Sequence, residues 1–223
     1  SKYFYAFFAL TMSINMFITG GRAGQVMFFA MITILIFQYY NPKRIKAAVL
    51  TMIIVPSIFM SAYSLSPQFN NRVNDAIDNI SSYNDEGKRD TSVGQRITYT
   101  LNSFKIIQQN PLFGVGTGDF PDEYKKVHMN NTPDVGLTVN PHNMYILTTV
   151  QLGVLGLASM LLIFYHQLKF ALSSKIGIVK DLGVVLPMLF LVIMWSDSYL
   201  LGHYTTILFV FFSSFLYKDF EKN

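Results

Sequence analysis

The sequence has no cysteine, a single tryptophan and few charged residues, which make up 13% of its 223 positions. A chain without cysteine forms neither disulfides nor thiolate metal sites, and its histidines and carboxylates do not cluster at metal-ligand spacing, so no metal or cofactor is predicted. The hydrophobic fraction of 51% and the 20 phenylalanines indicate an integral membrane protein. The net charge of +4 comes without a basic, aromatic-rich patch. It therefore fits loops beside membrane lipids better than a nucleic-acid partner.

Long apolar runs predict an all-α fold, a polytopic membrane bundle of about six spans. A helix needs about 17 to 25 mostly apolar residues to cross a bilayer. The candidate spans are Tyr3–Thr19, Ala23–Tyr40, Ile45–Leu65, Asn143–Tyr165, Val179–Trp195 and Tyr199–Tyr217. The chain starts with Ser1 and enters an apolar run almost at once, so we expect it to be part of a longer protein.

Basic residues near the ends of these runs set the expected orientation. They concentrate in "NPKRIK", in "HQLKFALSSKIGIVK" and in the tail "YKDFEKN". By the positive-inside rule these three stretches are cytoplasmic. The predicted organisation is therefore three spans in residues 1–65, a long outer region in residues 66–141, and three spans with a cytoplasmic tail in residues 142–223.

The outer region contains one clear helix signal. "SVGQRITYTLNSFKIIQQ" opens with a capping-box pattern, Ser92 with Gln95, and continues with an apolar stripe, which predicts an amphipathic helix over 92–109 on the outer membrane face or on the ends of the spans. Residues 70–90 are polar and weakly periodic, and we expect a mobile loop there. "PLFGVGTGDF" lacks the strand and the GK[ST] ending of a phosphate loop, so it predicts a turn between helices.

His142 lies at the start of an apolar run, in "NPHNMYILTTVQLGVLGL". Asn140 is a candidate N-cap, which would place the histidine in the first helical turn. On one continuous helix, three small residues would share its face and admit a neighbouring helix: Thr149, Gly153 and Gly156. A histidine beside the anion-binding end of a helix fits a general base. The alternative is a residue that only caps the helix or anchors it at the membrane interface.

Two arginines are expected on the same side of the membrane as His142. Arg22 lies in "TGGRAGQ" at the start of a span, and Arg96 lies near the start of the amphipathic helix. A cation at a helix start opposes the helix dipole, and an arginine pair is suited to binding a diphosphate. Alternatively, each arginine only reaches from an interface helix to the lipid headgroups. Asp197 and His203 in the last outer loop could face the same cavity or only decorate the interface.

These residues resemble a known family. His142 and Asn143, followed by nine residues and then Gly153-x-x-Gly156, reproduce the H-[NSQ]-x9-G-x-x-G pattern of bacterial O-antigen ligases. "GQRITYTLNSFKIIQQNPLFGVGTGDF" and "GGRAG" are also similar to regions of the wider ligase and polymerase superfamily. The resemblance runs from about Arg22 to Leu157. About six spans would correspond to the C-terminal half of such an enzyme.

The resemblance implies a GT-C-type glycosyltransferase of the bacterial inner membrane whose active site faces the periplasm. Such an enzyme transfers a glycan from undecaprenyl diphosphate to the lipid A-core of lipopolysaccharide, by an inverting reaction that needs no metal or cofactor. His142 would be the general base, and Arg22 and Arg96 would hold the diphosphate. Further substrate contacts would come from Asn143, Asp197 and His203.

Other functions remain open on the sequence alone. A glycan polymerase or a protein O-oligosaccharyltransferase of the same superfamily would use the same donor with another acceptor. A transporter is disfavoured, because the spans carry no buried ion pair and show no inverted repeat.

Overall fold

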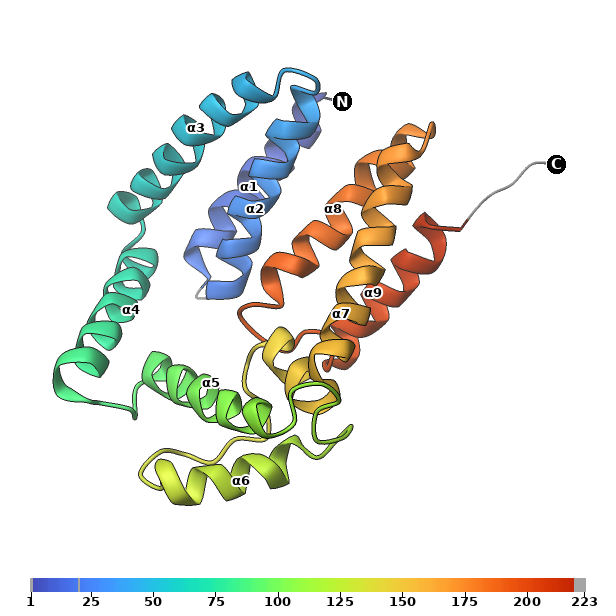
Figure 1. Ribbon diagram of the computed structural model, residues 1–223. Coiled ribbons are helices and arrows are strands. Elements are labelled where there is room, and N and C mark those ends of the chain that lie inside the picture. The colour runs from blue at the N-terminus through green and yellow to red at the C-terminus, as the bar shows by residue number, and fades with distance from the viewer. Residues whose placement is uncertain (1, 20, 219–223) are drawn as a thin grey trace. The chain divides into compact units, whose positions relative to one another are not determined.

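The computed structural model describes residues 2–19 and 21–218, and this part of the chain is all-α (Figure 1). The all-α prediction is therefore confirmed. Chain contacts divide the protein into two compact units, residues 1–81 and residues 82–223. The described helices are α1 (Lys2–Ile18), α2 (Arg22–Tyr39), α3 (Arg44–Leu65), α4 (Pro67–Glu86), α5 (Ser92–Gln109), α6 (Phe120–Asn131), α7 (Met144–Ser173), α8 (Gly177–Ile193) and α9 (His203–Leu216).

By length and composition, two of the described helices are able to cross a membrane, namely α3 and α7. Shorter apolar helices lie over Tyr3–Ile18, Ala23–Tyr39 and His203–Leu216. Their length is below or close to the lower limit for a membrane span. The arrangement with about six spans therefore stays a prediction.

The first unit is built around aromatic contacts between its helices. The ring of Phe17 on α1 lies 5.3 Å from that of Phe28 on α2 and 5.3 Å from that of Phe69 on α4. The hydroxyl of Ser66 donates a hydrogen bond of 2.7 Å to the carbonyl of Phe17, which ties the start of α4 to the end of α1.

Helix α4 corrects the expectation of a mobile loop over residues 70–90. It is helical from Pro67 to Glu86, and Asn74 accepts a hydrogen bond of 2.9 Å from the hydroxyl of Tyr63. Apolar residues recur at helical spacing within its polar sequence: Phe69, Val73, Ile77 and Ile80. The polar composition of the segment concealed this apolar stripe.

In the second unit, α5 lies between α6 and the start of α7 and occupies the range predicted for the amphipathic helix. Its N-cap is Thr91, whose side-chain oxygen accepts from the Gly94 backbone at 3.0 Å, so the cap lies one residue before the expected Ser92. One face of α5 buries Tyr99 and Ile106. The core completed around them contains Phe120, Tyr124, Leu147 and Val150.

Helix α7 is broken at Gly153, whose φ is 66° and ψ is −169°. The turn between α5 and α6 fills the break: the Val115 backbone donates to the Val150 carbonyl at 2.9 Å, and the Val154 backbone donates to the Pro111 carbonyl at 2.8 Å. A Cβ on Gly153 would lie 2.1 Å from the carbonyl oxygen of Leu112. The predicted turn in "PLFGVGTGDF" is thus confirmed, and its function here is to bind α7.

These contacts correct the proposed role of the two motif glycines. Gly153 admits a loop and a change of direction, rather than a neighbouring helix. A Cβ on Gly156 would meet the Leu152 side chain, which belongs to the same helix on the other side of the break, at 2.1 Å. His142 precedes the helix, so it shares no continuous helical face with Thr149 and the glycines.

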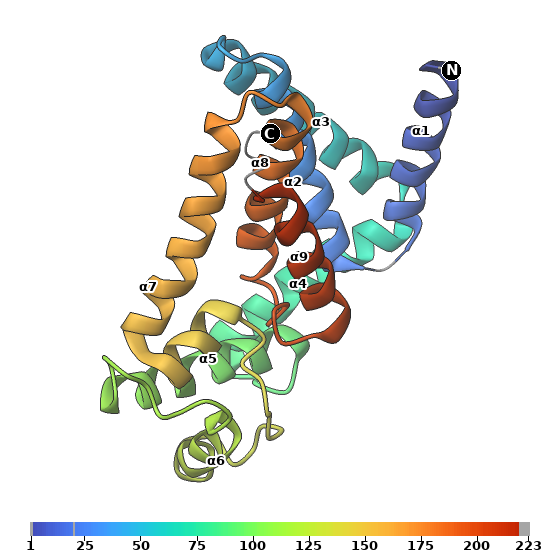
Figure 2. The same ribbon diagram turned by 90° about the vertical axis from the view of Figure 1, so that its right-hand side faces the viewer.

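Helices α7, α8 and α9 lie side by side in both views of the second unit (Figures 1 and 2). The ring of Phe209 on α9 lies 4.8 Å from that of Phe190 on α8 and 5.4 Å from that of Phe164 on α7. At the start of α7, the Met144 backbone donates to the Met194 carbonyl at 2.9 Å. This bond holds the loop between α8 and α9 against the residues around His142.

Candidate active site

His142 lies immediately before the N-cap of α7 in a backbone conformation that few side chains adopt. Its φ is 54°, and among the described residues other than glycine only His142 has a positive φ. Such a conformation costs on the order of 1–3 kcal/mol, and residues that adopt it cluster at functional sites. The expected N-cap is wrong by three residues: Asn143, not Asn140, caps α7, and its side-chain oxygen accepts from the Ile146 backbone at 3.1 Å.

The imidazole of His142 contacts a carboxylate from the loop between α8 and α9. Its Nδ1 lies 3.2 Å from Oδ1 of Asp197. An ionised carboxylate only accepts hydrogen bonds, so this contact requires the proton of a neutral imidazole to be on Nδ1. The other ring nitrogen, Nε2, then carries a free lone pair. This is the arrangement of a general base whose tautomer is fixed by an acid.

Asn140 and Ser198 hold this pair in place. The side-chain oxygen of Asn140 accepts from the His142 backbone at 3.0 Å and from the Ser198 hydroxyl at 2.7 Å. The Ser198 backbone donates to Oδ1 of Asp197 at 2.7 Å. These bonds join two loops more than fifty residues apart in the sequence, and they fix both members of the pair.

Arg96 reaches the same loop from α5. Its Nη1 donates to the Ser196 carbonyl at 3.0 Å. A guanidinium has five N–H donors, so this bond leaves most of them available for an anionic ligand. Arg96 thus binds the residue next to Asp197, and the structure brings it together with His142 in one cavity.

Arg96 and His142 line a common cavity of about 670 Å³. Most of its wall is apolar: Val93, Ile97, Leu101, Phe104, Ile107, Pro141, Ile146, Leu157 and Trp195. A large apolar cavity with a few converging polar groups is the usual form of a ligand site. This one has room for a hydrocarbon segment beside one cation and one potential base.

Tyr99 lies next to the histidine on the buried side of α5. The two ring centroids are 6.1 Å apart and the rings are inclined by 27°. Burial raises the pKa of Tyr99 above its usual 10.0, so the phenol is neutral near pH 7. The tyrosine therefore supplies a packing surface for His142 without adding charge.

The two further predicted substrate contacts differ in position, because Asn143 lines the His142 cavity and His203 does not. Both ends of the Asn143 side-chain amide are engaged within the protein, since its nitrogen donates to the Trp195 carbonyl at 3.2 Å while its oxygen caps α7. His203 lies outside the His142 cavity and lines an adjacent one of about 400 Å³ together with Asn140 and Asp197. Asp197 thus lines the cavity of His203 and contacts His142, which lines the larger one.

Arg22 is the first residue of α2, in the first unit, and its side chain lies outside the described residues. Within the described part of the chain, no group of three or more histidines and carboxylates is placed to hold a metal ion.

Residues 7–161, more than half of the chain, match the family described as O-antigen ligase. The chain belongs to the O-antigen ligase family. The matched range includes the motif around His142, as well as Arg22 and Arg96. Family membership and the apolar helices together indicate a membrane protein.

This member of the O-antigen ligase family is also similar to an uncharacterized protein of Haemophilus influenzae. The two are 28% identical over 151 residues, which cover 66% of this chain and 37% of the relative. The chain therefore spans little more than a third of the length of that relative.

Asn140 and Ser198 hold the His142–Asp197 pair in place, which the sequence did not reveal. Both are small polar residues in loops, where such residues are common, and they bond to each other across 58 positions. A periodic pattern cannot indicate a contact of this kind.

Proposed function

We propose that this protein is an O-antigen ligase that transfers a glycan from undecaprenyl diphosphate to the lipid A-core. One observation carries the proposal: a histidine held by a carboxylate opens into a large, mostly apolar cavity that also contains an arginine. The apolar wall suits the prenyl part of a lipid-linked donor. The arginine suits its diphosphate.

In the proposed reaction, a hydroxyl of the acceptor sugar attacks the anomeric carbon of the donor glycan. His142 takes the hydroxyl proton at Nε2 as the new C–O bond forms. The bond from the anomeric carbon to the diphosphate oxygen breaks, and undecaprenyl diphosphate leaves with the electron pair. Attack from the face opposite the leaving group inverts the anomeric configuration, and no metal or cofactor takes part.

The two kinds of side chain contribute separately. A general base typically accelerates such a step by about 10² to 10⁴. Arg96 would neutralise the charge that develops on the leaving diphosphate, which is worth more in a water-poor site than in bulk water. The family resemblance adds Arg22 to the diphosphate site, an assignment made from the sequence.

Asp197 enters the proposal as a positioning residue, because it contacts the ring nitrogen opposite the proposed base. His203 and Asn143 remain proposed substrate contacts from the sequence. The proposed location is the bacterial inner membrane, with about six spans in this chain and the cavity facing the periplasm.

The acceptor separates this function from its nearest alternatives. The intact protein would be purified and given undecaprenyl diphosphate carrying a labelled glycan, together with lipid A-core, a second lipid-linked glycan or an unglycosylated protein. We expect label on lipid A-core. Growth of the lipid-linked chain would instead indicate a polymerase, and labelled protein an O-oligosaccharyltransferase. Absence of transfer to every acceptor would contradict glycan transfer altogether.

A further inference from the structure

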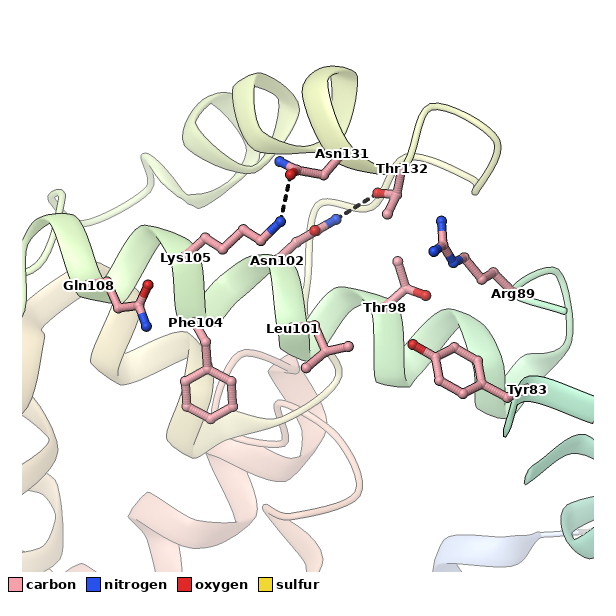
Figure 3. Close-up of a pocket in the computed structure, with 10 residues that line it drawn as sticks. All are labelled: Tyr83, Arg89, Thr98, Leu101, Asn102, Phe104, Lys105, Gln108, Asn131 and Thr132. Carbon is pink, nitrogen blue, oxygen red and sulfur yellow. Dashed lines mark hydrogen bonds between the residues drawn. The ribbon is translucent and has the colours of Figure 1, made fainter. Parts of the chain in front are cut away.

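A cavity distinct from those of His142 and His203, called the second cavity below, lies along α5 on the side that faces the end of α6. Its volume is about 440 Å³, within the range of small-molecule sites. Figure 3 shows Asn131 and Thr132 on one side of it and Lys105, Asn102 and Thr98 of α5 on the other. None of the residues named above for catalysis lines this cavity.

The lining of this second cavity is cationic. Lys105 donates to the side-chain oxygen of Asn131 at 2.5 Å, and no described carboxylate lies within ion-pair distance of it. Arg89 has one loose ion-pair partner, Asp134, at 3.7 Å, and its side chain is 41% exposed. No lining residue is acidic. Because few carboxylates neutralise these two positive charges, the cavity favours an anionic group.

The neutral part of the lining is suited to sugar hydroxyls. Asn102, which is 2% exposed, donates to Thr132 at 2.7 Å and to the Tyr124 hydroxyl at 3.2 Å. These bonds fix the wall before any ligand arrives, and a fixed wall lowers the entropic cost of binding. Beside it, the side-chain amide of Gln108 offers both a donor and an acceptor.

Two residues connect this cavity to the candidate active site. Leu101 and Phe104 line both the second cavity and the cavity of His142. In Figure 3 both side chains lie on the side of α5 away from Asn131 and Thr132. A glycan whose reacting end lies at His142 can therefore pass over these two side chains and place a later sugar beside Arg89 and Lys105.

We propose that this second cavity binds an acidic sugar, one that carries a carboxylate or a phosphate, within a glycan whose reacting end lies at His142. The inference rests on the proposed glycan transfer for the identity of the ligand. It adds a subsite that selects charged glycans at a distance from the reaction. The acidic sugar would belong either to the donor glycan or to the acceptor glycan.

Binding is measured with the intact purified protein, a trisaccharide that contains glucuronate and its neutral glucose counterpart. The test variant is Arg89→Gln with Lys105→Gln, and the control is Lys125→Gln with Lys126→Gln, which removes the same charge from the exposed surface of α6. We expect the wild type and the control to prefer the acidic trisaccharide. The test variant should lose at least about tenfold in affinity for it, since a charged hydrogen bond contributes about 1.5–3 kcal/mol.

Three results would overturn the proposal: equal affinity for the acidic and neutral trisaccharides, an equal loss in test and control variants, or binding to phosphatidylglycerol vesicles in place of sugar. His142→Ala separates the subsite from the reaction, because this variant should lose transfer and keep trisaccharide binding. Conversely, a wild type that binds the trisaccharide but transfers no glycan would contradict the proposed function alone.

The source of the acidic sugar follows from transfer kinetics with substrates that carry glucuronate. If it belongs to the acceptor, the Arg89→Gln, Lys105→Gln variant should raise KM for the acceptor and leave KM for the donor unchanged. If it belongs to the donor, the reverse is expected. Unchanged KM values for both substrates would contradict the subsite.

Discussion

At the scale of single residues, the candidate site depends on contacts between two loops. His142 comes before α7, whereas Asp197 comes between α8 and α9, and their side chains meet at 3.2 Å. The ring orientation is thus determined by residues distant in sequence. The motif around His142 was sufficient to predict a base, but nothing local indicates that an acid 55 positions away would contact it.

Replacing Asp197 tests whether its carboxylate positions the imidazole of His142. In Asp197→Asn, the new amide can donate to Nδ1 and so stabilise the tautomer whose proton is on Nε2, which removes the base. We expect the transfer rate to fall by about 10² or more, most of the contribution of a general base. Asp85→Asn, an exposed change on α4, is the control. Transfer at the wild-type rate by Asp197→Asn would show that the contact is only structural.

Replacing Arg96 by lysine tests whether its planar guanidinium binds the diphosphate. Arg96→Lys keeps the charge but loses the planar fork that binds a diphosphate through two oxygens. We expect transfer to fall by about tenfold or more, since one charged hydrogen bond contributes about 1.5–3 kcal/mol. Initial rates at several donor concentrations measure this loss. Arg72→Lys on α4 provides a matched control, and equal rates for the two variants would contradict diphosphate binding by Arg96.

At the scale of elements, α5 and α4 show what a sequence pattern can and cannot reveal. The apolar stripe of α5 follows a recognisable capping pattern, and the helix occupies the predicted range, Ser92–Gln109. The stripe of α4 is diluted by asparagines and aspartates, which favour turns, and its helix was missed. The break in α7 was missed for another reason. Gly153 lies in an apolar run, and its need for a positive φ arises only from the loop that packs on it.

Gly153→Ala tests the break. A Cβ there would lie 2.1 Å from a carbonyl oxygen, and the residue would have to keep a φ of 66°. We expect a loss of at least about 3 kcal/mol in the free energy of unfolding, from strain and the clash together. Fluorescence of the single tryptophan, Trp195, can follow unfolding in detergent.

Gly177→Ala is the control for the break in α7, because a Cβ at Gly177 would meet no atom within 4 Å. Equal unfolding curves for the Gly153 and Gly177 variants would contradict the structural role of the break.

At the scale of the whole molecule, the sequence predicted the fold class and the family. Composition indicated a membrane protein, and the histidine motif pointed to the O-antigen ligases, the family to which the chain belongs. Orientation in the membrane follows from the basic residues that flank the apolar runs, and it stays a prediction. The number of spans also stays a prediction, because several apolar helices are short.

The absence of cysteine allows a direct test of orientation. Lys125→Cys on α6 and Lys46→Cys near the start of α3 each introduce the single thiol of the chain. In intact cells with a permeabilised outer membrane, a thiol reagent that cannot cross the inner membrane should label residue 125 and leave residue 46 unlabelled. Disruption of the inner membrane should expose both thiols. The opposite pattern would place the His142 cavity on the cytoplasmic side.

The central claim is that His142 accepts the proton of the attacking hydroxyl, and the transfer rate of His142→Ala tests it most directly. Wild-type and variant proteins are compared at equal amounts in the membrane, with undecaprenyl diphosphate glycan as donor and lipid A-core as acceptor. The account predicts that the variant retains at most about 1% of the wild-type rate, because a general base contributes about 10² to 10⁴. Transfer by His142→Ala at the wild-type rate would contradict it.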